Sequence, residues 1–296
     1  MHTSSFPRTV LVTGATGNLG RKLIEALACI PECDRIIGID VKTENAAFSP
    51  AAQANLTLIQ ADLTRPGEWL TALDGVEAIV HFAAASPLPD SSWEEALISC
   101  DMTLNLLRAS VLYKVRRFVF ASSNHAMGAY KDDPLGPSML TTQLSPRPGT
   151  RWFDGSKEIY SLAYGHSKVM GEKLCAGIAE ASAGSLSCIS IRVGWVLPGE
   201  NDPRSISHSG APTSTASHLQ LNDNELSTLR WFRDMWLSNN DFQTLFLSAL
   251  RADQKGWPEP SIIINGVSRN TDTVWDLTTA KEWVGYEAQD DIYKYL

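Results

Sequence analysis

The sequence TVLVTGATGNLG, residues 9–20, runs from an apolar segment through three glycines into a helical pattern. Its first five residues are apolar or β-branched and are typical of a strand buried on both faces. The helical pattern opens at Asn18 and continues to Cys29. A strand, a tight turn and a helix in this order predict the first βα unit of a parallel sheet.

Outward from this unit, apolar segments alternate with helical patterns. Further strands are predicted at residues 35–40, 56–60, 78–82, 117–121 and 188–193, and further helices at 92–112 and 161–181. Strands that are apolar almost throughout require helices on both faces of the sheet. The sequence therefore predicts an α/β fold with a doubly wound parallel sheet of the Rossmann type.

The glycine turn predicts a dinucleotide site. Glycines there let the backbone approach a pyrophosphate, while the helix N-terminus supplies N–H groups and a positive dipole end. The spacing is G-x-x-G-x-x-G, which differs from the common G-x-G-x-x-G fingerprint. The turn residues expected to bind the cofactor are Gly14, Thr16, Gly17, Asn18, Leu19 and Gly20.

Asp40 ends the second predicted strand and indicates which cofactor is bound. A carboxylate there accepts hydrogen bonds from both ribose hydroxyls and repels a 2′-phosphate. NAD is therefore favoured over NADP, although Lys42 lies close by. Residues after the next two strands complete the expected cofactor site, with Asp62 at the adenine edge: Asp62, Leu63, Ala83, Ala84 and Ala85.

Tyr164 and Lys168 lie four residues apart on the predicted helix 161–181 and so share one of its faces. A neighbouring ammonium group favours the phenolate form of a tyrosine, which can then act as a general base. Ser122 and Ser123 end the fifth predicted strand, at the edge where ligands bind in such sheets. A serine hydroxyl there can stabilise charge on a substrate oxygen, and as an alternative it caps the strand end.

The glycine turn, the strand-end serines and the Tyr–Lys pair, in this order, resemble the extended short-chain dehydrogenase/reductase family, whose members are NAD-dependent epimerases, dehydratases and dehydrogenases. The resemblance implies that Ser123, Tyr164 and Lys168 are catalytic. Tyr164 would be the acid/base, and Lys168 would also bind the nicotinamide ribose. Ser99 stands where the family often has an asparagine that holds a proton-relay water.

Within that family, the segments FASSNH at residues 120–125 and YGHSK at residues 164–168 are most similar to uronate dehydrogenases. The resemblance implies oxidation of the anomeric carbon of a sugar acid with NAD. It also implies that Ser86, Ser123 and Asn124 line the sugar.

A sugar acid needs a cation, and arginine is the expected residue because its planar fork pairs two carboxylate oxygens. Arg204 is the leading candidate, with Arg230 and Arg233 as alternatives. Residues 201–229, a long segment after the sixth predicted strand, are expected to form a lid that carries this arginine. Trp195 stands where the resemblance to uronate dehydrogenases implies a small hydroxyl residue. The bulk of this tryptophan favours instead a neutral or differently shaped sugar.

Composition and charge limit the classes of protein to which the chain can belong. The chain has 296 residues, is 44% hydrophobic and carries a net charge of -8, which excludes disorder and argues against nucleic acid or an anionic membrane as partner. Five scattered cysteines form no disulfide framework, and no metal site is expected. Without an apolar run of bilayer length or a signal pattern, a cytoplasmic location is expected. The sequence leaves the oligomeric state open, with a homo-oligomer as one possibility.

Two parts are expected: a dinucleotide-binding core over residues 1–194, which includes the catalytic residues, and a small substrate-binding or lid region over 195–296. In the second part, helices are predicted at 226–237, 242–252 and 278–284, and a late strand at 262–264. The leading function is NAD-dependent oxidation of a monosaccharide or sugar acid. The alternatives are a nucleotide-sugar epimerase or dehydratase, and a regulator that senses NAD(P) without chemistry.

Overall fold

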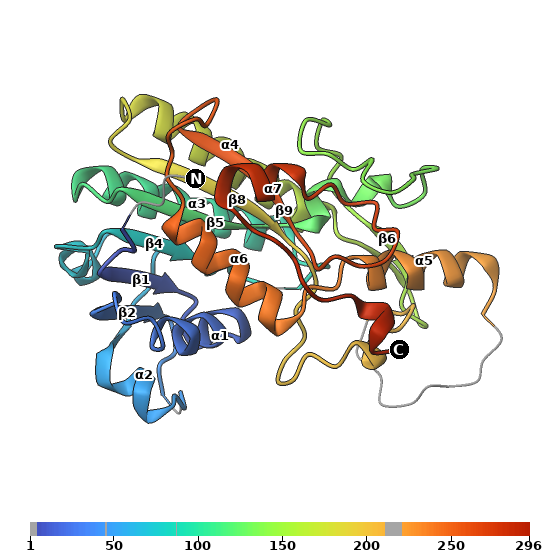
Figure 1. Ribbon diagram of the computed structural model, residues 1–296, viewed down its shortest axis with the longest axis horizontal. Coiled ribbons are helices and arrows are strands. Elements are labelled where there is room, and N and C mark those ends of the chain that lie inside the picture. The colour runs from blue at the N-terminus through green and yellow to red at the C-terminus, as the bar shows by residue number, and fades with distance from the viewer. Residues whose placement is uncertain (1–4, 45, 87, 211–220) are drawn as a thin grey trace.

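A seven-stranded parallel sheet forms the centre of the computed structural model, which describes residues 5–44, 46–86, 88–210 and 221–296 (Figure 1). The strands lie in the order β3-β2-β1-β4-β5-β8-β9, and each neighbouring pair is parallel. Their bounds are β1 (Thr9–Thr13), β2 (Arg35–Asp40), β3 (Leu56–Gln60), β4 (Ala78–His81), β5 (Arg117–Ser123), β8 (Ser187–Val193) and β9 (Ser261–Gly266). The predicted doubly wound sheet is confirmed.

Helices cover both faces of this sheet, as its apolar strands require. Their bounds are α1 (Asn18–Leu27), α2 (Pro50–Asn55), α3 (Trp93–Leu112), α4 (Leu162–Ala181), α5 (Asp223–Asp234), α6 (Asn239–Arg251) and α7 (Thr278–Val284). Side chains of α1, α6 and α7 pack into one apolar core with the strands. Those of α3 and α4 pack into a second core on the opposite face. The sheet is therefore buried between two apolar cores.

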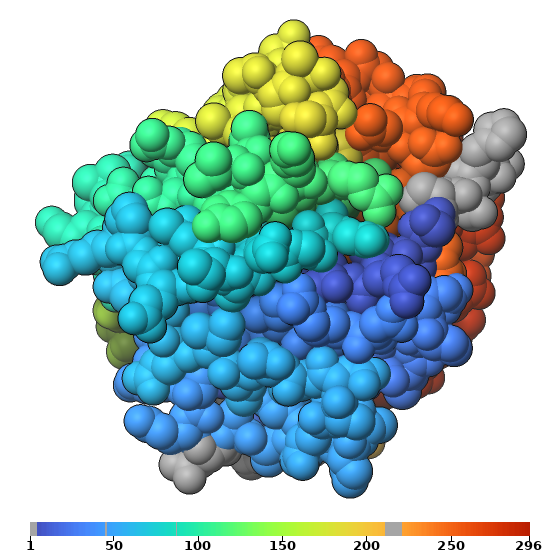
Figure 2. All heavy atoms as spheres, turned by 90° about the vertical axis from the view of Figure 1, so that its left-hand side faces the viewer, coloured from blue at the N-terminus to red at the C-terminus, as the bar shows by residue number. Residues whose placement is uncertain are grey.

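A third apolar cluster lies beyond those carboxyl ends and contains Trp152, Phe232 and Trp236. It joins α5 to a short antiparallel hairpin of β6 (Arg151–Phe153) and β7 (Glu158–Tyr160), which the sequence analysis did not predict. Figure 1 shows β6, α5 and the C-terminus gathered on the right, past the ends of the strands. Figure 2 shows the opposite end of the molecule, where the N-terminal half of the chain covers most of the surface.

Residues 195–296 contribute both to this cluster and to the sheet. β9 forms an edge of the sheet beside β8, and α6 and α7 belong to the first core. Of the expected lid, residues 211–220 lie outside the described residues. Residues 223–229 belong to α5, which Asn222 caps by accepting a hydrogen bond from the Glu225 amide. The helix therefore begins three residues earlier than its predicted start at Leu226. Among the described helices, none is long and apolar enough to cross a membrane.

Candidate active site

A cavity of about 770 Å³ lies at the carboxyl edge of the sheet. The turn between β1 and α1, the ends of β2, β4, β5 and β8, and residues of α4 and α5 all contribute to its lining. Ligands of doubly wound sheets bind at this edge, because the loops there are free of the helices that cover the two faces.

The backbone of the glycine turn packs too closely at the start of α1 to admit side chains at Gly14 and Gly20. Gly14 has a φ of +66°, and a Cβ at this position would lie 2.9 Å from the amide nitrogen of Ala83. A Cβ at Gly20 would overlap the carbonyl oxygen of Gly14. Gly17 occupies the N-cap of α1 and makes no side-chain capping bond, so the helix N-terminus opens on the cavity. This arrangement fits the pyrophosphate of a dinucleotide.

Asp40 lines the cavity at the end of β2, where it is tied to the glycine turn. Its Oδ2 accepts hydrogen bonds from the amide of Thr16 at 3.0 Å and from the Thr16 hydroxyl at 2.8 Å. Its Oδ1 accepts from the amide of Val41 at 2.8 Å. Three donors therefore hold the carboxylate in a fixed orientation beside the predicted pyrophosphate position.

Most of the predicted cofactor residues come together around this cavity. Those in its lining are Gly14, Thr16, Gly17, Asn18, Leu19, Gly20, Asp40, Leu63, Ala83, Ala84, Tyr164 and Lys168. Two predicted residues, Asp62 and Ala85, are outside the lining. The exposed Asp62 accepts a hydrogen bond from the amide of Thr64, which lowers the pKa of its carboxyl group. Its two neighbours in sequence, Ala61 and Leu63, line the cavity.

The two strand-end serines have different partners. The Ser122 hydroxyl donates at 2.6 Å to the buried carboxylate of Glu172, which is itself paired with Arg192. The Ser123 oxygen accepts from the amide of His125 at 3.2 Å, which leaves its hydroxyl hydrogen available. Both line the cavity, but only the Ser123 proton is uncommitted in this arrangement.

Tyr164 and Lys168 both line the cavity from α4, on the face expected from their spacing. The Lys168 side chain is buried, and its ammonium donates to the carbonyl of Ala121 at 2.9 Å. The same Nζ lies 5.4 Å from the centre of the Tyr164 ring. The buried Lys168 side chain therefore lies beside the Tyr164 ring.

Asn124 and His125 directly follow the two strand-end serines, and both also line the cavity. The Asn124 amide nitrogen donates to the carbonyl of Val193, while its buried Oδ1 has no hydrogen-bond partner in the part of the chain that the structure describes. Nδ1 of His125 lies 2.9 Å from the Thr150 hydroxyl and 2.7 Å from that of Ser161. Desolvation lowers the pKa of His125 to about 4, so the imidazole is neutral at pH 7. In the sequence analysis, His125 appears only as the last residue of the segment FASSNH, and no binding or catalytic role was predicted for it.

Aromatic side chains form the end of the cavity next to His125. Trp152, Trp195 and Phe232 all line it, from β6, from the segment after β8 and from α5. The sequence analysis singled out Trp195 alone. Nothing local marks Trp152 or Phe232, because each is an ordinary apolar residue of its own segment, and they meet through the tertiary structure.

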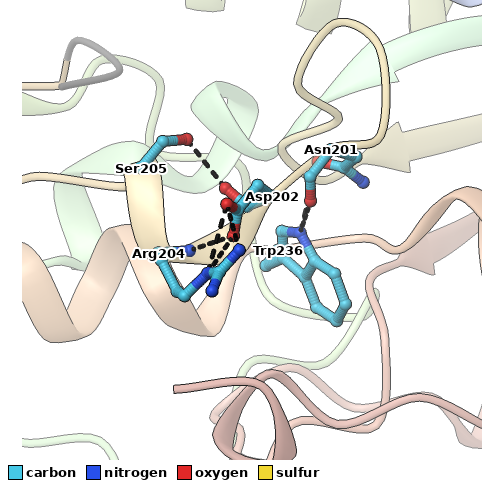
Figure 3. Close-up of polar contacts among 5 residues, drawn as sticks. All are labelled: Asn201, Asp202, Arg204, Ser205 and Trp236. Atoms are coloured by element: carbon cyan, nitrogen blue, oxygen red, sulfur yellow. Dashed lines mark hydrogen bonds and ion pairs between the residues drawn. The ribbon is translucent and has the colours of Figure 1, made fainter. Parts of the chain in front are cut away.

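None of the three candidate arginines lines the cavity. Figure 3 shows the exposed Arg204 turned to Asp202, whose carboxylate accepts from its Nε at 2.9 Å and from its Nη2 at 2.8 Å. Arg230 is exposed on α5, and Arg233 on the same helix has a buried Nε without a partner among the described residues. The structure thus gives no support to the prediction that Arg204 binds substrate.

Two serines that the resemblance pointed to lie beside the cavity and do not line it. Ser86 is buried and accepts a hydrogen bond from the amide of Leu88. The Ser99 hydroxyl donates to the carbonyl of Glu95 and accepts from the amide of Ala85 at 3.0 Å. Ser99 therefore holds the backbone after β4. In the described part of the chain, no group of three or more His, Cys, Asp or Glu side chains is placed to hold a metal ion.

Comparisons with known proteins agree with this geometry. Residues 10–258 match the model of the NAD dependent epimerase/dehydratase family. The chain is 28% identical over 292 residues to an L-arabinose 1-dehydrogenase (NAD(P)(+)) of Haloferax volcanii, which covers 95% of this chain and 96% of that one. It is 30% identical over 200 residues to a uronate dehydrogenase of Pseudomonas putida, covering 67% of this chain and 64% of that one.

Among solved structures, a single-site mutant of uronate dehydrogenase from Agrobacterium tumefaciens, complexed with NAD, superimposes with a TM-score of 0.66. It is 25% identical in sequence, and the alignment covers 97% of this chain and 87% of that one.

Proposed function

This chain belongs to the NAD dependent epimerase/dehydratase family, and from that membership we propose that it is an oxidoreductase which oxidises a monosaccharide or sugar acid with NAD. The observation that carries the proposal is that Ser123, Tyr164 and Lys168 line the same cavity as the glycine turn. Relatives along almost the whole chain are named as sugar dehydrogenases, which supports the same reaction class.

Each residue has a distinct part in the proposed chemistry. The Ser123 hydroxyl donates a hydrogen bond to the substrate oxygen that becomes a carbonyl, and stabilises charge that develops there. Tyr164 accepts the proton of that hydroxyl group as its carbon is oxidised. Lys168, held by the carbonyl of Ala121, keeps a positive charge beside the phenolate and the nicotinamide ribose. NAD, when bound, accepts the hydride from the substrate carbon.

The residues at the glycine turn fit this cofactor. Without side chains at Gly14, Gly17 and Gly20, the turn brings the uncapped N-terminus of α1 to the cavity, where a pyrophosphate would bind. The oriented carboxylate of Asp40 lies where ribose hydroxyls would donate to it.

A spectrophotometric screen tests the proposed function. Purified protein is mixed with NAD and, in turn, with D-galacturonate, D-glucuronate and neutral aldoses, and NADH formation is followed. We expect NADH with at least one sugar. If none yields NADH while a nucleotide sugar is epimerised or dehydrated, the oxidation proposal fails and the epimerase alternative replaces it.

Asp40 provides a separate prediction about cofactor choice. Asp40→Asn keeps an oxygen for the Thr16 donors but removes the charge that repels a 2′-phosphate. The ratio of kcat/KM for NAD over NADP should fall by about tenfold or more, because juxtaposed like charges cost several kcal/mol. Asp74→Asn, at an exposed aspartate outside the cavity, is the matched control and should leave the ratio unchanged. Equal use of both cofactors by the unmodified protein would contradict this role for Asp40.

A further inference from the structure

The aromatic end of the cavity adjoins the proposed acid/base. The rings of Tyr164 and His125 lie edge to face, with centres 5.5 Å apart, and His125 is 6.2 Å from Trp152. Phe232 contacts Trp152 and Trp195 edge to face, each at 5.4 Å between ring centres. We call Trp152, Trp195 and Phe232 the aromatic wall. It adjoins His125, whose ring contacts that of Tyr164.

Tertiary contacts hold the three rings in place. The indole nitrogen of Trp152 donates to the carbonyl of Ser209 at 2.9 Å. The backbone of Trp195 donates to Met235 at 2.7 Å and accepts from the amide of Leu237 at 3.0 Å. Phe232 is buried between the other two rings. Preorganised rings give apolar contact at little cost in conformational entropy.

The polar groups at this end are suited to hydroxyl groups. Asn124 lines the cavity, and its buried Oδ1 has no hydrogen-bond partner among the described residues. Its orientation follows from the bond that the amide nitrogen makes to Val193. An acceptor of this kind takes a hydrogen from a sugar hydroxyl, whereas a carboxylate offers it none at neutral pH. The neutral imidazole of His125 adds no positive charge.

The lysines and arginines of the chain offer no dedicated partner for a carboxylate at the aromatic wall. Residues 1–4, 45, 87 and 211–220 contain no Lys or Arg, so all 25 lie in the described ranges. Within those ranges, the cavity is lined by Lys42 and Lys168 and by no arginine. Lys42 lies beside Asp40 at the ribose end, and Lys168 is bound to Ala121. A carboxylate against the aromatic wall would lose its hydration without gaining a dedicated partner, which is unfavourable.

We propose that the substrate is an uncharged aldose, and that the aromatic wall selects it by packing against the apolar C–H face of the sugar ring. Asn124 Oδ1 then accepts a hydrogen bond from a ring hydroxyl. This inference rests on the proposed function and narrows its substrate class: sugar acids and sugar phosphates are disfavoured because they bring an unpaired charge to the wall.

Three sugars that differ at one position provide the test. D-Galacturonate, D-galactose and L-arabinose share their ring configuration and carry a carboxylate, a hydroxymethyl group and a hydrogen at the same carbon. We expect kcat/KM for the two neutral sugars to exceed that for galacturonate by about tenfold or more, as for an unpaired charge in an apolar pocket. Galacturonate turnover equal to or better than that of both neutral sugars would overturn the inference.

Variants of Trp195 test the wall itself. Trp195→Ala should lower kcat/KM for the preferred sugar by about ten- to a hundredfold, mainly through KM, because it removes ground-state and transition-state contact alike. Trp195→Phe keeps a ring and should retain most of the activity. Trp93→Ala, at an exposed tryptophan outside the cavity, is the matched control. An unchanged KM in Trp195→Ala, with its affinity for NADH intact, would also overturn the inference.

A binding measurement separates this inference from the proposed function. Calorimetric titration of the three sugars into the protein saturated with NADH reports binding without turnover. Tighter binding of the neutral sugars supports the inference even if the oxidation screen is negative, in which case only the proposed reaction fails. Binding of galacturonate as tight as that of the neutral sugars refutes the inference while leaving the oxidation intact.

Discussion

Replacing Tyr164 with phenylalanine should reduce kcat by about 10²–10⁴, the usual contribution of a general base, while NADH still binds. The substitution keeps the ring that packs against His125 and beside Lys168, and removes the oxygen that would accept the substrate proton. Turnover is measured by NADH formation, and binding by fluorescence titration with NADH. The affinity for NADH should change little, because the glycine turn and Asp40 supply most of the proposed cofactor contacts.

The matched control is Tyr160→Phe. Tyr160 lies on β7, outside the cavity, and its ring stacks under the guanidinium of Arg151. Its kcat should stay within about twofold of the unmodified enzyme, since surface substitutions rarely disturb a remote site. If Tyr164→Phe keeps most of its activity, the base lies elsewhere and the non-catalytic alternative gains weight.

Glu172→Gln should lower the free energy of unfolding by about 3–5 kcal/mol, because breaking a buried ion pair leaves an uncompensated charge. The side chains of Glu172 and Arg192 are each 1% exposed, and Glu172 also accepts from Ser122. The pair links α4 to β8, and the Ser122 bond extends it to β5. These elements carry the proposed catalytic residues, so the loss should also reduce activity.

Urea denaturation of Glu172→Gln measures this effect, with Glu180→Gln as control on the same helix, where the glutamate is exposed. A double variant, Glu172→Leu with Arg192→Met, replaces the pair by apolar side chains and should recover most of the lost stability. A destabilisation by Glu172→Gln of less than about 1 kcal/mol would mean that the pair contributes no more than an exposed one.

Local sequence determined the sheet to a large extent. The predicted strands 9–13, 35–40 and 56–60 have the bounds found in the structure, because continuous apolar runs between turns leave few other options. The predicted strand 117–121 ends two residues short of β5, since Ser122 and Ser123 are polar and gain burial only from α4 and β8. The hairpin of β6 and β7 went unpredicted, because three-residue strands carry too little periodicity.

The sequence alone determined the parallel α/β sheet, the glycine turn, Asp40 and the Tyr164–Lys168 pair. Each depends on spacing within one or two adjacent elements, where backbone geometry converts sequence separation into position. Tertiary structure alone decided that Ser122 is committed to Glu172, that Arg204 pairs with Asp202 away from the cavity, and that three aromatic rings meet beside His125. Trp152, Trp195 and Phe232 are separated by dozens of residues, and their contact depends on how the segment after β8 and α5 pack against β6. Packing between distant segments has no local periodicity to reveal it.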